Sequence, residues 1–380
     1  MKPLGLYVHI PFCVGRCAYC DFVSYPWQEN KEDFGKFLFK ELDLRIESAC
    51  FEEKEVQSVY FGGGTPSLLK PSFFRSFLNT LRVRGILSPS PEVTLEVNPE
   101  TITPGKLREW RAAGITRLSV GVQSFQSRYL IFLGRATSLK RIHEALEAIQ
   151  KENWKNWNVD LIYGLPLQDF DTWQEDIEKV LRYAPPHVSI YSLTLEPWVP
   201  LASFFRRHRR LLPSFDAQAY LFRFAEKKLG DAGYLHYEVS NFALPGFECQ
   251  HNLLYWRNGE YVGLGPSAWT HLGRKRQKNA SSLRTYAKML QSGRLPIVFE
   301  EEIVQDLKTL EDLALLLRTS RGVPVSLLSS SELRGFVQDL IKEGLLFTRG
   351  GYLYPSSLGY LLLHQILSEL FARKRVSQDA

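Results

Sequence analysis

Short apolar runs alternate with longer segments of helical periodicity over residues 1–200 of this chain. Strands are predicted at Leu4–Ile10, Ser58–Phe61, Glu92–Val97, Arg117–Val122, Asn158–Tyr163 and Val188–Leu193, and helices at Asp33–Glu47, Pro71–Leu81, Pro104–Ala113, Leu139–Gln150 and Thr172–Leu181. Repeated strand–helix units form a parallel sheet with helical crossovers. The sequence therefore predicts an α/β fold, an incomplete (β/α)6 barrel whose functional residues lie at the carboxyl ends of the strands.

The remainder of the chain is expected to form two smaller parts. Residues 201–295 would extend the barrel, and residues 296–380 would form a small winged-helix-like α+β domain. Its predicted elements are helices at Ile303–Thr319 and Ser331–Lys342, with Ser331 as N-cap, and a hairpin around Gly350 and Gly351. Winged helices often bind DNA, but the balanced charge here favours a packing or lid role.

Three cysteines, Cys13, Cys17 and Cys20, lie within eight residues directly after the first predicted strand. Thiolates at this spacing can hold three irons of a 4Fe-4S cluster and leave the fourth iron open to a small molecule. A structural zinc site needs a fourth ligand, and Cys50 and Cys249 are distant in sequence. A disulfide framework is untypical of a long chain with five cysteines, so those two are expected to be free, buried thiols.

Composition limits the class of protein. The net charge of +6 is too small to indicate nucleic-acid binding, and no nucleic-acid partner is expected. No apolar run is long enough to span a bilayer, so a cytoplasmic protein is predicted. Basic residues gather at 206–210 and 274–278, which by default are solvated surface. The first run is a candidate for peripheral contact with an anionic membrane.

Gly62-Gly63-Gly64-Thr65-Pro66 follows the second predicted strand. Consecutive glycines allow the backbone to approach a ligand closely. The segment lacks the Gly-Lys-Ser/Thr ending of a P-loop, and alone it would predict only a tight turn. Downstream of a three-cysteine loop, it indicates backbone acceptors for an amino group bound at the open iron.

The cysteine loop followed by Gly-Gly-Gly-Thr-Pro resembles the radical S-adenosylmethionine (SAM) superfamily, in which the open iron chelates SAM and an electron cleaves its sulfonium to a deoxyadenosyl radical. Other stretches resemble the branch that contains oxygen-independent coproporphyrinogen III oxidase and related haem chaperones. They are Tyr-Val-His-Ile-Pro-Phe-Cys, Leu-Glu-Val-Asn-Pro, Ser-Val-Gly-Val-Gln-Ser-Phe and Val-Asp-Leu-Ile-Tyr-Gly-Leu-Pro. The resemblance covers essentially the whole chain.

The resemblance implies a 4Fe-4S cluster on the three cysteines and SAM beside it. The implied SAM positions are Tyr7, Gly63, Gly64, Thr65, Glu96, Gln123, Arg135 and Asp160, some of them for a second SAM molecule. Tyr19 can shield the cluster or pack on a nucleobase. From the residues alone, Glu96, Gln123 and Asp160 could equally cap strand ends, and Tyr7 and Tyr19 could be ordinary core aromatics.

Three features separate the activities within this branch. Phe22 stands where the oxidase has a fourth cysteine, and the chain lacks the oxidase's N-terminal extension. His251-Asn252-Leu253-Leu254-Tyr255-Trp256 matches the chaperones' His-Asn-x-x-Tyr-Trp motif, which implies haem at His251, Tyr255 and Trp256, with Arg257 near a propionate and Cys249 as a lesser ligand candidate. Without the resemblance, a histidine beside aromatics is more often structural.

Two functions therefore remain open. The first is a haem chaperone that keeps the cluster and SAM site and delivers haem to acceptor proteins, in the cytoplasm or at the inner membrane face. The second is a radical coproporphyrinogen III oxidase that decarboxylates porphyrinogen propionates. The three features above favour the first, and a tRNA-modifying radical enzyme lacks support because no RNA-binding appendage is evident.

Overall fold

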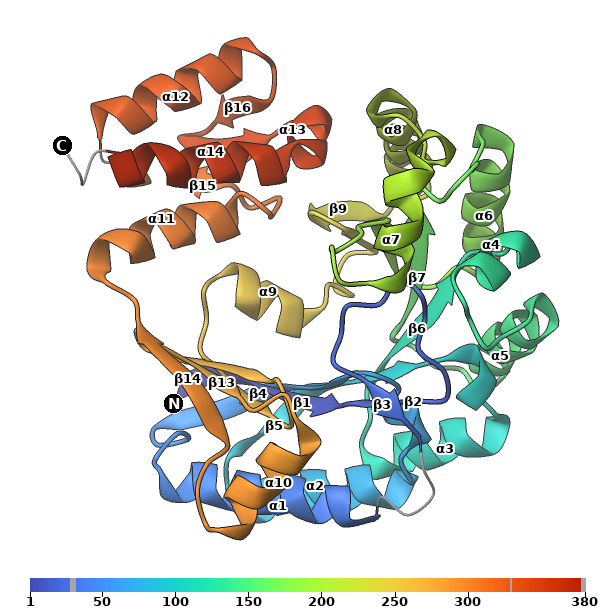
Figure 1. Ribbon diagram of the computed structural model, residues 1–380, viewed down its shortest axis with the longest axis vertical. Helices are drawn as coiled ribbons and strands as arrows, with labels where there is room; N and C mark the ends of the chain where they lie inside the picture. Colours follow the sequence, from blue (N-terminus) through green and yellow to red (C-terminus); the bar gives the residue numbers. More distant parts are fainter. Residues whose placement is uncertain (28–31, 329, 377–380) are drawn as a thin grey trace.

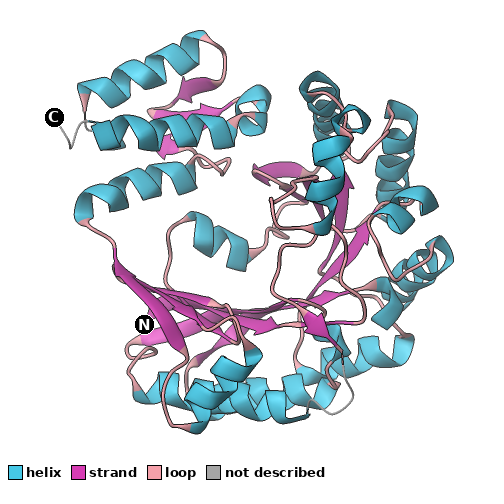
Figure 2. Ribbon diagram, viewed as in Figure 1, coloured by secondary structure: helices cyan, strands magenta, loops and turns pink. Residues whose placement is uncertain are grey.

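A curved sheet with helices on its outer side forms most of the molecule, as the computed structural model shows for residues 1–27, 32–328 and 330–376 (Figures 1 and 2). Its parallel part contains, in spatial order, β1 (Lys2–Ile10), β4 (Lys54–Gly63), β5 (Leu87–Val97), β6 (Arg117–Gln123), β7 (Trp157–Tyr163) and β8 (His187–Ser192). The crossover helices are α1 (Glu32–Glu47), α2 (Pro71–Val83), α3 (Pro104–Ala113), α5 (Leu139–Lys151) and α6 (Phe170–Tyr183). The predicted incomplete (β/α)6 barrel is confirmed.

The sheet continues past both ends of the parallel part, to twelve strands. Beside β1 lie β11 (Tyr261–Leu264), β12 (Trp269–Leu272), β13 (Lys275–Asn279) and β14 (Ile297–Glu302), and beside β8 lie β10 (Asn241–Ala243) and β9 (Leu235–Glu238). The basic run 274–278, expected to be simply solvated surface, supplies strand β13. Lys275 and Arg276 lie opposite Glu302 and Glu301 of β14, so charge pairing replaces apolar alternation there.

Several shorter elements complete the barrel side. They are β2 (Phe12–Cys13), β3 (Tyr25–Pro26), α4 (Ser127–Phe132), α7 (Pro200–Arg207), α8 (Phe215–Asp231), α9 (Gln250–Trp256), α10 (Leu283–Gln291), and 3-10 turns at Pro66–Leu68, Pro99–Thr101 and Arg209–Leu211. The strands β2 and β3 pair with each other and flank the cysteine loop. Within the described residues, no helix is long and apolar enough to cross a membrane.

The C-terminal part has an apolar cluster of its own, which includes Leu313, Val323, Phe336 and Leu353. Its elements are α11 (Gln305–Leu316), β15 (Val323–Pro324), a 3-10 turn at Val325–Leu327, α12 (Ser331–Lys342), β16 (Leu346–Arg349), β17 (Tyr352–Pro355), α13 (Ser357–Leu361) and α14 (Leu363–Val376). Helices followed by a hairpin agree with the winged-helix-like prediction. The predicted N-cap was wrong by one residue, because the hydroxyl of Ser330 accepts the Leu333 N–H at 3.1 Å.

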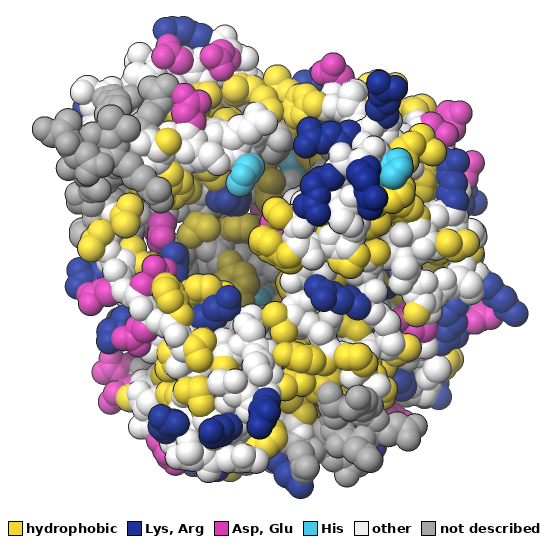
Figure 3. All heavy atoms as spheres, viewed as in Figure 1, with side chains coloured by type: hydrophobic (Ala, Val, Ile, Leu, Met, Phe, Trp, Pro, Cys, Tyr) yellow, Lys and Arg dark blue, Asp and Glu magenta, His cyan; other side chains and the backbone are white. Residues whose placement is uncertain are grey.

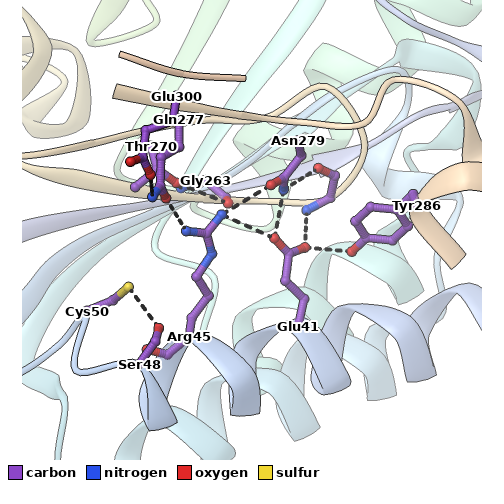
Figure 4. Close-up of polar contacts among 11 residues, drawn as sticks. Glu41, Arg45, Ser48, Cys50, Gly263, Thr270, Gln277, Asn279, Tyr286 and Glu300 are labelled. Carbon is purple, nitrogen blue, oxygen red and sulfur yellow. Dashed lines mark hydrogen bonds and ion pairs between the residues drawn. The ribbon is translucent and has the colours of Figure 1, made fainter. Parts of the chain in front are cut away.

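A buried polar network ties α1 to the far strands of the sheet (Figure 4). The carboxylate of Glu41 accepts hydrogen bonds from Tyr286 Oη at 2.6 Å, Asn279 Nδ2 at 2.7 Å and the Gly265 N–H at 2.8 Å. Arg45 lies 3.7 Å from Glu41 and donates to Asn279 Oδ1. A buried charge is tolerated only when it is paired and hydrogen-bonded, and this network meets both conditions.

Candidate functional site

The cysteine loop and the carboxyl ends of the parallel strands border a cavity of about 440 Å³, called the first cavity here. Its lining contains most of the residues predicted from the sequence: Cys13, Cys17, Tyr19, Cys20, Gly63, Gly64, Thr65, Glu96, Gln123, Arg135 and Asp160. Strands β4 to β7 each supply at least one of them, because parallel strands all end at the same edge of the barrel. Tyr7 lies outside this lining.

The three thiols are free and partly buried. Burial raises the pKa of Cys13, and it raises the pKa of Cys20 to about 11. Arg135 approaches from α4's C-terminal side, with Nη1 3.7 Å from Cys17 Sγ, and supplies a compensating positive charge. Cysteine thiolates are the usual ligands of iron–sulfur clusters, and three thiols on one loop fit a cluster in which each thiol binds a separate iron.

The glycine motif packs against the chain that leads into the cysteine loop. Gly63 has φ +110°, and a Cβ there would lie 2.5 Å from the ring of His9. A Cβ on Gly64 would lie 2.6 Å from the carbonyl oxygen of Phe12. The N–H groups of Gly64 and Thr65 donate to Ile10 and Phe12 backbone oxygens. These glycines therefore hold the loop as well as line the cavity.

Glu96 on β5 lines the first cavity. Its carboxylate accepts the Gly63 N–H at 3.0 Å and the Tyr60 hydroxyl at 2.9 Å. Burial, with Asp160 nearby as a smaller cause, raises the pKa of Glu96 to about 7. A ligand ammonium beside this carboxyl would favour its ionised form. The position therefore fits the amino group of SAM.

Besides Ser24 Oγ, two polar atoms of residues that line the first cavity, Arg135 Nε and Glu100 Oε2, are buried and have no hydrogen-bond partner among the described residues. Arg135 is otherwise fixed, with Nη2 2.9 Å from Asn98 Oδ1 and 2.7 Å from the Gly121 oxygen. Unsatisfied buried polar atoms are costly, so both are available to a polar ligand. The donor set thus fits SAM beside a cluster.

Sequence reasoning missed other residues of the first cavity, among them Asn98, Glu100, Ser119 and Tyr191. Asn98 and Glu100 directly follow the predicted strand Glu92–Val97, so the rule that strand ends carry function could have found them. Ser119 and Tyr191 lie inside strands and carry no such signal.

A second cavity of about 620 Å³ adjoins the first, and Asp21, Phe22 and Glu96 border both. Aromatic rings dominate its lining: Tyr7, Phe22, Tyr60, Tyr255, Tyr261 and Trp269, together with His9, His251 and Lys278. The face seen in Figure 3 is hollowed near its centre, with hydrophobic side chains inside the hollow. Tyr7 and the haem candidates His251 and Tyr255 are therefore grouped here.

The other residues proposed for haem lie outside this lining. The indole of Trp256 donates to Glu238 Oε2 at 2.8 Å, and the guanidinium of Arg318 lies 5.5 Å from its ring. Arg257 is exposed and lines neither cavity. Cys249 is buried and free, whereas Cys50 is only half-buried, contrary to expectation.

His251 on α9 is fixed by both ring nitrogens. Nδ1 lies 2.8 Å from the Ser58 hydroxyl and Nε2 lies 2.9 Å from the Tyr255 hydroxyl, while the ring of Tyr60 stacks on it at 5.2 Å. Burial lowers its pKa to about 3, so the imidazole is neutral. Neutral imidazole is the form that binds iron, but one of these hydrogen bonds would have to open first.

Helix α9 is anchored at its start by Glu92 of β5. The Glu92 carboxylate accepts the N–H groups of Gln250 and His251, each at 3.1 Å, and the thiol of Cys249. A negative charge at a helix N-terminus is favourable because the first N–H groups lack partners within the helix. Strand β5 thus supplies both Glu92, which binds the start of the helix that carries His251, and Glu96, which lines the first cavity.

Comparisons with known proteins agree with this site. A family model described as the radical SAM superfamily matches residues 7–180. Heme chaperone HemW of Mycobacterium tuberculosis H37Rv is 35% identical over 97% of this chain and 95% of that protein, and heme chaperone HemW of Escherichia coli K12 is 37% identical over 70% of each chain.

A solved structure shows the same fold over nearly the whole chain. Coproporphyrinogen III oxidase (HemN) from Escherichia coli, a radical SAM enzyme, superposes with a TM-score of 0.80 and 22% identity, over 97% of this chain and 90% of that one. The sequence identity to the HemW protein of Mycobacterium tuberculosis is higher, and that match also covers 97% of this chain. The chain therefore belongs to the HemW heme-chaperone family of the radical SAM superfamily.

Proposed function

We propose that this protein is a haem chaperone that holds a 4Fe-4S cluster and SAM in the first cavity, binds haem in the second, and passes the haem to acceptor proteins. The observation that carries the proposal is the shared wall of the two cavities at Asp21, Phe22 and Glu96. The cysteine loop and the His251 motif, far apart in sequence, thereby serve adjoining spaces. Relatives that match 97% of the chain are named heme chaperones.

Within the first cavity, Cys13, Cys17 and Cys20 would bind the cluster, which supplies an electron to the ligand on its open iron. Arg135 would offset the negative charge of the bound sulfurs, since its guanidinium already lies beside Cys17. Glu96 would pair with the ammonium of SAM and, through its bond to the Gly63 N–H, fix that ligand against the glycine turn.

The oxidase remains the second candidate, because the fold of this chain matches that enzyme. Phe22 argues against it. Its side chain is 55% exposed and borders both cavities, at the position where the resemblance places a fourth cysteine in the oxidase. A phenyl ring offers an apolar surface to a flat ligand and cannot ligate iron or transfer a proton.

The test uses the anaerobically reconstituted protein. We expect stoichiometric haem uptake in a visible-absorbance titration, weaker uptake in His251→Ala, and no conversion of coproporphyrinogen III with SAM and a reductant. The exposed His208, which lines neither cavity, supplies the matched control His208→Ala. Turnover of coproporphyrinogen III at an enzymatic rate, or haem uptake no better than that of an unrelated protein, would overturn the proposal.

We also infer that delivery takes place in the cytoplasm at an anionic membrane surface. Arg206, Arg207, Arg209 and Arg210 are exposed on α7 and the following turn, and basic side chains gather over α7 beside the hollow (Figure 3). Flotation with anionic vesicles should carry the protein upward, whereas zwitterionic vesicles should not. Equal flotation with both vesicle types would refute the electrostatic contact.

A further inference from the structure

The basic run 274–278 contains one cation that differs from the others. Arg274 pairs with Glu302 at 2.7 Å, Lys275 with Glu300 at 3.6 Å and Arg276 with Glu311 at 2.7 Å. Lys278 forms no ion pair with a carboxylate in the part of the chain that the structure describes. Its side chain instead lines the second cavity. Ion pairs with Glu302, Glu300 and Glu311 therefore account for the first three cations but not for Lys278.

Neighbouring strands hold Lys278 at the rim of that cavity. It lies opposite Trp269 of β12 and opposite Phe299 of β14, and its ammonium is 5.4 Å from the centroid of the Trp269 ring. The Trp269 and Phe299 rings meet edge to face at 5.7 Å. A cation above an aromatic face is stabilised without losing its charge. The ammonium is thus held in place while it stays available to an anion.

The charges around the second cavity are unevenly placed. Lys278 is the only lysine or arginine among the described residues that line it, and the carboxyl groups of Asp21 and Glu96 border the first cavity as well. Among these residues, Lys278 therefore supplies the side-chain cation that can pair with a carboxylate of a bound ligand.

The shape and lining of the cavity also define the ligand. A volume of about 620 Å³ falls within the roughly 300–1,000 Å³ typical of sites that enclose a large organic ligand. Several aromatic rings offer faces to a flat conjugated molecule. A planar macrocycle with carboxylates on one edge matches both the rings and the single cation.

We propose that Trp269 and Lys278 form the carboxylate-recognising end of the haem site, with the indole against the porphyrin face and the ammonium paired with a propionate. This inference rests on the proposed function and deepens it. It gives the propionate contact to Lys278 rather than to Arg257, which is exposed and outside the lining. Trp269, at 38% exposure, has ring surface free for the ligand.

The experiment compares haem with haem dimethyl ester, in which both propionate charges are removed. We expect Lys278→Met to weaken haem binding roughly tenfold, as the loss of one charge-assisted contact predicts, and to leave binding of the ester unchanged. Lys278→Arg should keep the affinity for haem. Trp269→Ala should weaken both ligands, because stacking does not depend on the propionates.

Lys275→Met is the matched control, since Lys275 lies on the same strand and pairs with Glu300 away from the cavity. It should change neither affinity. Equal effects of Lys278→Met on haem and ester, or no effect on either, would refute the assignment while wild-type haem binding still supports the chaperone. Absence of haem binding by the wild-type protein would overturn the proposed function, and this inference with it.

Discussion

Replacing Glu41 by leucine removes the acceptor at the centre of the buried network in Figure 4. The Glu41 side chain is 0% exposed, and that of its ion-pair partner Arg45 is 1% exposed. The variant leaves the Arg45 guanidinium without its carboxylate, and it removes the acceptor of the Tyr286 hydroxyl and of the Gly265 N–H. Removing one partner of a buried ion pair typically costs about 3–5 kcal/mol, and we expect a loss of that size in the free energy of unfolding.

Two further variants separate the contributions. Tyr286→Phe removes only the 2.6 Å bond to Glu41 Oε2, which predicts a loss of about 1.5–3 kcal/mol because the acceptor is charged. In the double variant Glu41→Leu with Arg45→Met, no charge is left unpaired. Its loss in the free energy of unfolding should therefore be smaller than the sum of the losses in Glu41→Leu alone and Arg45→Met alone.

Urea unfolding followed by circular dichroism gives these free energies. Glu47→Leu, on an exposed position of the same helix, is the control and should change stability by no more than about 0.5 kcal/mol. A loss below about 1 kcal/mol in the free energy of unfolding of Glu41→Leu would refute the reasoning, because the buried network would then stabilise the protein no more than a surface ion pair does. Strictly additive losses in the double variant would refute the ion-pair argument.

Three further predictions concern the first cavity. Cys17→Ser should abolish the visible absorbance of the reconstituted cluster, whereas Cys50→Ser should retain it, and equal spectra would contradict the ligand assignment. Because burial raises the pKa of Glu96 from 4.5 to about 7, the folded apoprotein retains a proton in that interval that the unfolded chain releases. The contribution of Glu96 to the free energy of unfolding should therefore fall by about 3 kcal/mol as the pH rises from 4.5 to 7. When the free energy of unfolding is measured with urea at several pH values, Glu96→Gln should lack this decrease. Gly63→Ala should cost about 1–3 kcal/mol, because φ is +110° and the new Cβ would lie 2.5 Å from a histidine ring. Gly15→Ala, where a Cβ has nothing within 4 Å, should cost far less stability when both variants are compared by thermal unfolding.

The parallel barrel was predictable because short strands rich in Val, Leu and Ile alternate with segments of helical periodicity. The prediction was too short at β5, which begins at Leu87 rather than Glu92. Pro89 and Pro91 argue against a strand because proline cannot donate to the ladder. In the structure the pairing passes from Val56–Leu87 to Ser58–Glu92 through an irregularity, and the prolines lie in that irregular stretch.

Strands β12 to β14 and the second cavity could not be predicted, since they depend on partners far apart in sequence. Strand β13 has no apolar alternation and is held by the acidic residues of β14. Four residues singled out from the strands, Gly63, Glu96, Gln123 and Asp160, all line the first cavity, although Asp160 lies within β7 rather than at its end. No periodicity links Lys278 with His251, because only the completed sheet sets them around one space.

The position of β1 has a consequence for synthesis. β1 is paired on one side with β4, as at Leu6–Val59, and on the other with β11, as at Leu6–Val262. On the ribosome the second edge therefore stays open until most of the chain has emerged, and such non-local pairing forms slowly. An unpaired edge invites pairing with another molecule. During synthesis, β1, which leads into the cysteine loop, thus has an unpaired edge for longer than the other parallel strands, and it is exposed to aggregation for longer.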